Sequence, residues 1–110
     1  MSRFGKVYVR LSENPKPGEL VEIRAMVMHP MESGFRLDNV GRAIPRYIVD
    51  TFTCAYGGKE VFRAKLHPAM SSNPYFVFYV VAAHSAELLF TWTDDHGDVA
   101  THSVALQLAA

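Results

Sequence analysis

The chain has 110 residues, 49% of them hydrophobic, so it is long enough to bury a core and too apolar to be disordered by composition. Its 11 basic and 11 acidic residues give a formal net charge of zero without a basic stripe, which disfavours nucleic acid or an anionic membrane as a partner. No apolar run approaches the ~20 residues of a membrane helix, and we expect one domain over residues 1–110.

Alternating segments begin close to the N-terminus. Residues 6–11 and residues 19–28 each alternate, which is typical of half-buried strands. The expected inward side chains are Val7, Val9, Leu11, Val21, Ile23, Ala25 and Val27, and the expected outward ones are Lys6, Tyr8, Arg10, Glu22, Arg24, Met26 and Met28. Between the two strands, Asn-Pro-Lys-Pro-Gly has the composition of a turn.

Residues 28–45 neither alternate like a strand nor repeat like a helix. The stretch is long for a connection inside a small domain, which is typical of a functional or disordered loop. It carries too much apolar surface for a solvated linker: Met28, Met31, Phe35, Leu37, Val40 and Ile44. We therefore expect an ordered loop packed on the end of the domain, with His29, Met31 and Phe35 contributing to a partner interface.

The C-terminal half continues with strand-like segments separated by turns. The expected strands are residues 47–56, 60–66, 75–81, 87–93 and 99–108, with a Gly-Gly hairpin turn at 57–58 and a loop at 67–74. Trp92 is the expected core anchor, on one face with Leu88 and Phe90. Seven short strands without a helical pattern predict an all-β fold, an immunoglobulin-like antiparallel β-sandwich.

Residues 75–81 are apolar on both faces, unlike a strand that exposes one face to water. We expect the phenylalanine face to be core and the opposite face, with Tyr75, Val77 and Tyr79, to dock on a partner. The alternative is that the loop 28–45 or the N-terminal strand covers that face.

Cys54 is the only cysteine, which excludes an internal disulfide and any multi-cysteine metal site. Its neighbours are aromatic and apolar, so we expect a small buried side chain. The alternative, a reactive thiol, requires an accessible and electropositive setting.

Two stretches contain residue types that bind metals. Met26-x-Met28-His29-Pro30-Met31 offers thioether and imidazole groups that suit copper, and Asp94-Asp95-His96-Gly97-Asp98 resembles an ion-binding cluster. The first lacks the nearby cysteine of a blue-copper site, and the second has the composition of a short hairpin turn. We expect no metal or other cofactor, and no catalytic residues, since no serine lies in a glycine-flanked nucleophile elbow.

Several segments together resemble the SoxZ family, the companion subunit of the SoxYZ sulfur carrier in periplasmic thiosulfate oxidation. They are His-Pro-Met-Glu-Ser-Gly at 29–34, Ile44-Pro45, Gly-Lys-Glu-Val-Phe at 58–62, Ser-Asn-Pro-Tyr at 72–75 and Thr-Trp-Thr-Asp-Asp-His-Gly at 91–97. The match runs through residues 19–98, most of the chain, with the segments in the order and spacing of the family.

The resemblance implies a non-catalytic subunit that holds SoxY, whose flexible C-terminal arm carries sulfur intermediates on a cysteine. The chain ends Val-Ala-Leu-Gln-Leu-Ala-Ala, without such an arm, and its first residues lack an apolar signal region. By resemblance we expect a periplasmic protein co-exported with its signal-bearing partner, which transiently meets the sulfur-oxidising enzymes of the pathway. The alternatives are a periplasmic copper-binding β-sandwich and a free-standing immunoglobulin-like structural module.

Overall fold

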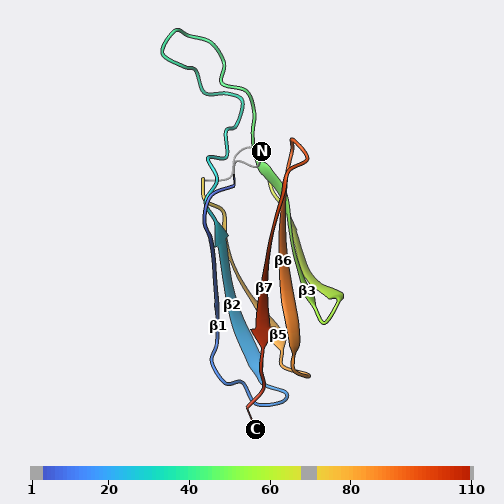
Figure 1. Cartoon of the computed structure of the whole chain (residues 1–110). Helices are drawn as coiled ribbons and strands as arrows, with labels where there is room; N and C mark the ends of the chain where they lie inside the picture. Colours follow the sequence, from blue (N-terminus) through green and yellow to red (C-terminus); the bar gives the residue numbers. More distant parts are fainter. Residues whose placement is uncertain (1–3, 68–71, 110) are drawn as a thin grey trace.

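A computed structural model describes residues 4–67 and 72–109, which form two antiparallel sheets (Figure 1). The strands are β1 (Val7–Leu11), β2 (Leu20–Val27), β3 (Val49–Tyr56), β4 (Lys59–Lys65), β5 (Tyr75–Val81), β6 (Ala86–Asp94) and β7 (Val99–Leu106). One sheet has the order β1-β2-β5 and the other β4-β3-β6-β7. The predicted all-β sandwich of seven strands is therefore confirmed.

Alternation along the strands decides which side chains enter the space between the sheets. In β2 the predicted inward residues, from Val21 to Val27, are fully buried, and Leu88, Phe90 and Trp92 of β6 meet them from the other sheet. Phe52 of β3 lies at the centre of the core, stacked on Phe76 of β5 at 4.7 Å between ring centroids. The β5 rings thus join the two sheets, as the alternation predicted.

The loop between β2 and β3 departs from the prediction. Residues 28–48, here called the projecting loop, pack on the end of the domain only at their base, and their outer part extends beyond the ends of both sheets (Figure 1). The principal extents of the molecule are accordingly 60 × 21 × 20 Å. The loop pairs with itself through the bridges Glu32↔Tyr47 and Leu37↔Ala43, so part of its backbone hydrogen bonding is made within the loop.

Several predicted strand ends shift by one or two residues. The third expected strand began at residue 47 and the last ended at 108, whereas β3 begins at Val49 and β7 ends at Leu106. Of the predicted loop 67–74, residues 68–71 lie outside the described part of the chain. Within 4–67 and 72–109 there is no helix long and apolar enough to cross a membrane.

Candidate partner interface

The strand β5 exposes an apolar face to solvent. Its inward residues Phe78 and Val80 are buried, whereas Tyr75, Val77 and Tyr79 are 52%, 45% and 58% exposed. Since β1 pairs with the far side of β2 and the projecting loop extends away from the sandwich, neither covers this face within the described residues. The division into a phenylalanine core face and a tyrosine outer face matches the expectation from sequence; whether that face meets a partner stays a prediction.

The register continues this surface across the whole three-stranded sheet. Leu20 lies opposite Val81, Arg24 opposite Val77, and Met26 opposite both Tyr75 and Tyr8. The outward side chains of the sheet are here called the outer face: Tyr8, Arg10, Leu20, Glu22, Arg24, Met26, Tyr75, Val77, Tyr79 and Val81. The outer face therefore combines apolar rows with charged groups.

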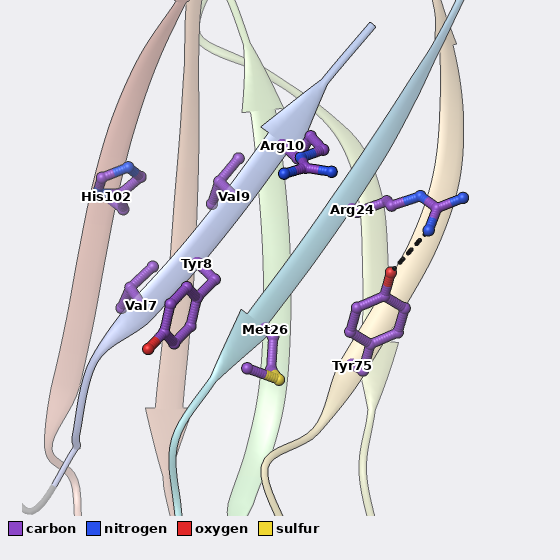
Figure 2. Close-up of a pocket in the computed structure, with 8 residues that line it drawn as sticks. All are labelled: Val7, Tyr8, Val9, Arg10, Arg24, Met26, Tyr75 and His102. Carbon is purple, nitrogen blue, oxygen red and sulfur yellow. Dashed lines mark hydrogen bonds between the residues drawn. The ribbon is translucent and has the colours of Figure 1, made fainter.

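A line of hydrogen bonds holds the two outward tyrosines of β5 in place. Arg24 donates to Glu22 at 2.6 Å and to the Tyr75 hydroxyl at 3.3 Å, and the Tyr79 hydroxyl donates to Glu22 at 3.1 Å. Figure 2 shows the bond from Arg24 to Tyr75. The hydrogen bonds from Arg24 and then from Tyr79 lower the pKa of the Glu22 carboxyl, and the same contact with Glu22 raises the pKa of Tyr79. Both rings are thus positioned before any partner binds.

The tip of the projecting loop is the second exposed apolar surface. Phe35 is 85% exposed, Leu37 60% and Val40 70%. The tip is nevertheless structured, because one Asp38 carboxylate oxygen accepts the backbone N–H groups of Val40 and Arg42. Large apolar side chains on an ordered, solvated projection are typical of an interaction site.

The base of the projecting loop buries two residues that were predicted to face a partner. His29 is 2% exposed and Met31 5% exposed. The Nδ1 atom of His29 accepts the backbone N–H of Met31 at 3.0 Å, and the His29 ring lies 4.6 Å from that of Tyr47 between centroids. The Met31 sulfur accepts the backbone N–H of Val49 at 3.2 Å.

These contacts correct the expectation for His29 and Met31 on the isolated chain. The backbone of Met31 has a φ of 52°, in the left-handed region, which turns the chain so that its side chain enters the core. Both residues fix the base of the loop. Of the predicted interface residues, Phe35, Tyr75, Val77 and Tyr79 remain on the surface, and Phe35 lies on a different element from the other three.

The stretches considered for metal binding have other roles in the structure. The described residues contain no group of three or more His, Cys, Asp or Glu side chains placed to hold a metal ion. Asp94 accepts the backbone N–H groups of His96 and Asp98, and Asp95 accepts that of Ile48 and pairs with Arg46 at 2.9 Å. These carboxylates organise the β6–β7 turn and attach the loop base to it.

Cys54 is fully buried in β3, and burial raises the pKa of its thiol to about 11. A thiol with that pKa is protonated near neutral pH, so the nucleophilic thiolate is scarce. The structure thus supports the expectation of a packed side chain.

Sequence reasoning placed Tyr8, Arg10 and Arg24 on outward faces of their strands but did not group them into a site. Only the register, in which Arg10 lies directly opposite Arg24, brings them together. The alternating pattern predicted the outward orientation of these side chains, but no local sequence signal predicted which strands pair.

The family of the chain follows from comparison with known proteins. The family model described as "SoxZ: Sulphur oxidation protein SoxZ" matches residues 9–105. A comparison with curated proteins finds no match.

Solved structures share the fold. A superoxide reductase (neelaredoxin) from Ignicoccus hospitalis superposes with a TM-score of 0.74 at 12% identity, over 96% of this chain and 81% of that one. A hypothetical protein from Pyrococcus horikoshii OT3 superposes with a TM-score of 0.64 at 15% identity, over 96% and 90% of the two chains. At such identities the similarity concerns the fold alone.

Proposed function

This chain belongs to the SoxZ family of sulphur oxidation proteins, and from that premise we propose that it is the non-catalytic binding subunit of a SoxYZ-type sulfur carrier. Its partner is a SoxY-like subunit whose cysteine-bearing arm carries the sulfur intermediates, and the two form a heterodimer. The pair works in the periplasm, exported by means of the partner's signal.

The observation that carries this proposal is the apolar, solvent-exposed side of β5. The core of the sandwich is complete without Tyr75, Val77 and Tyr79, yet these side chains leave about half of their surface in water. Tyrosine suits an interface because its ring is apolar and its hydroxyl polar, and it is common among residues that dominate binding energy. Arg24 donates a hydrogen bond to Tyr75, and Tyr79 donates one to Glu22. These bonds hold both rings, which reduces the entropy lost on docking.

The tip of the projecting loop supplies a second contact. The outer part of the projecting loop, which includes Phe35, extends beyond one end of both sheets and away from β5 (Figure 1). A subunit that docks through β5 therefore leaves the loop tip available for the enzymes of the pathway. We assign the β5 face to SoxY and the loop tip to those transient encounters.

The test is the affinity of purified chain for SoxY, measured by calorimetry, for wild type and for the variant Val77→Asp/Tyr79→Asp. Burying two new carboxylates in the interface raises Kd at least about 100-fold, since central interface residues contribute about 2–4 kcal/mol each. The matched control is Leu89→Asp, at a 41% exposed position on β6 of the other sheet.

Both variants keep the β circular dichroism of the wild type, because the replaced side chains lie outside the core. The double variant melts slightly below the wild type, because it loses the hydrogen bond from Tyr79 to Glu22 and places a carboxylate directly opposite Glu22. An unchanged Kd for the double variant, or the same loss of affinity for Leu89→Asp, contradicts the assignment of the β5 face. Unfolding of the isolated double variant would show that Val77 and Tyr79 are needed for the stability of the fold and would contradict their assignment to the interface.

A further inference from the structure

Two arginines lie side by side on the outer face. Arg10 of β1 is the direct cross-strand neighbour of Arg24 of β2. Like charges directly opposite one another on a sheet destabilise it. Arg24 is balanced by Glu22 at 2.6 Å, whereas the guanidinium of Arg10 has no hydrogen-bond or ion-pair partner within residues 4–67 and 72–109. The fold thus keeps an uncompensated cation beside a second one.

The arginines lie at the rim of an open hollow of about 490 Å³. Figure 2 shows Tyr8, Met26 and Tyr75 along β1, β2 and β5 below the two guanidinium groups, with His102 on β7 beyond β1. The residues that line the hollow are Val7, Tyr8, Val9, Arg10, Arg24, Met26, Tyr75 and His102. The hollow thus combines positively charged hydrogen-bond donors with aromatic and thioether surface.

The balance of charge around the hollow differs from that of the whole chain. Lys6, whose ammonium lies 5.6 Å from the Tyr8 ring centroid, adds a third cation to Arg10 and Arg24, against the single carboxylate of Glu22. Three positive groups and one negative group leave a net charge of +2 here, whereas the full chain has 11 of each sign. The outer face is therefore electrostatically complementary to an acidic surface.

We propose that Arg10 and Arg24 bind a carboxylate group of the protein partner that docks on the outer face. Arg10 presents an unoccupied planar fork of N–H donors, the geometry that pairs with both oxygens of a carboxylate. The hollow is open, so a small free ion would keep its water there. A carboxylate on a segment that packs against Tyr8, Met26 and Tyr75 loses that water, which strengthens its bonds to the guanidinium groups. The inference rests on the proposed function and adds the recognition element: an Asp or Glu side chain of SoxY.

The test uses the complex of the full chain with SoxY and the variant Arg10→Gln. The Kd rises at least tenfold in 0.15 M NaCl, which corresponds to loss of a hydrogen-bonded charge pair. The dependence of log Kd on log salt concentration becomes shallower, because one cation no longer contributes. Arg10→Lys restores the charge without the fork and gives an intermediate Kd.

The matched control is Arg63→Gln on β4, which removes the same charge from the other sheet and changes Kd less than twofold. The isolated Arg10→Gln chain melts at the wild-type temperature or slightly above it, since the variant relieves repulsion with Arg24. This combination of weaker binding and undiminished stability is not expected of a merely structural residue.

The outcomes separate the two proposals. Absence of wild-type binding to SoxY overturns the proposed function and, with it, this inference. Wild-type binding with equal Kd values for Arg10→Gln and Arg63→Gln overturns the carboxylate site alone. A third outcome is saturable binding of sulfate to the isolated chain that is lost in Arg10→Gln, while SoxY binding is unaffected. That outcome would show that the hollow binds a free oxyanion, and it would also overturn the carboxylate site.

Discussion

The burial of Met31 leads to a prediction that separates the base of the projecting loop from its tip. In Met31→Ala the core loses most of a side chain that is 5% exposed, which costs about 2–5 kcal/mol. The Val49 backbone N–H also loses the sulfur that accepts it at 3.2 Å, at a further cost of about 1 kcal/mol. Alanine has the same Cβ as methionine, so the strain of the left-handed backbone is equal in both proteins.

We therefore expect Met31→Ala to lower the free energy of unfolding by about 4 kcal/mol. For a domain of this size that corresponds to a decrease in Tm of about 15 °C. The assay is thermal and urea unfolding of the isolated chain, followed by circular dichroism. Met31→Leu keeps most of the volume but also lacks the sulfur that accepts the Val49 N–H, so it loses about 1–2 kcal/mol.

Phe35→Ala is the matched comparison at the loop tip. Because Phe35 is 85% exposed, its truncation changes the stability of the isolated chain by at most about 0.5 kcal/mol. Equal, small effects of Met31→Ala and Phe35→Ala would refute the argument that Met31 attaches the loop to the core.

Three further outcomes follow from the described contacts. Phe35→Asp lowers turnover of the complete pathway by several-fold without changing Tm, and turnover equal to wild type would remove the loop tip from the functional surface. Cys54→Ala costs about 1 kcal/mol of stability and leaves sulfur carriage by the complex intact, whereas rapid labelling of native Cys54 by a thiol reagent at pH 8 would contradict a pKa of about 11. The folded-state pKa of Glu22 lies below its ordinary value of 4.5, so its stabilising effect is complete above pH 4.5 and is lost as the pH falls through the lower, folded-state value. Acid unfolding of Glu22→Gln is therefore less steep over that range than that of wild type, and identical titrations would count against the Arg24–Glu22–Tyr79 line.

Strand alternation made much of the sandwich predictable. A period of two in residues 19–28 places Val21 and Val27 on the buried face, and the structure buries both. In residues 75–81 the same period separates Phe78 from Tyr79 correctly, although both faces are apolar. Local pattern suffices here because the faces of a strand are decided by its own backbone.

The projecting loop was misjudged because burial there depends on tertiary placement. Phe35 and Met31 are both large apolar residues in one irregular stretch, yet the first is exposed and the second is core. The difference arises from the left-handed backbone at Met31 and from the pairing of Glu32 with Tyr47, which directs the rest of the loop outward. Similarly, the cross-strand pair of Arg10 and Arg24 depends on the register between β1 and β2.

Site-specific photo-crosslinking tests the central claim, that the outer face of β5 docks on the cysteine-armed partner. A benzoylphenylalanine residue replaces Val77 in one protein and Leu89 of β6 in another, at similarly exposed positions of 45% and 41%. Each protein is mixed with purified SoxY and irradiated. We expect efficient crosslinking to SoxY from position 77 and little from position 89, and the reverse pattern would contradict docking through β5.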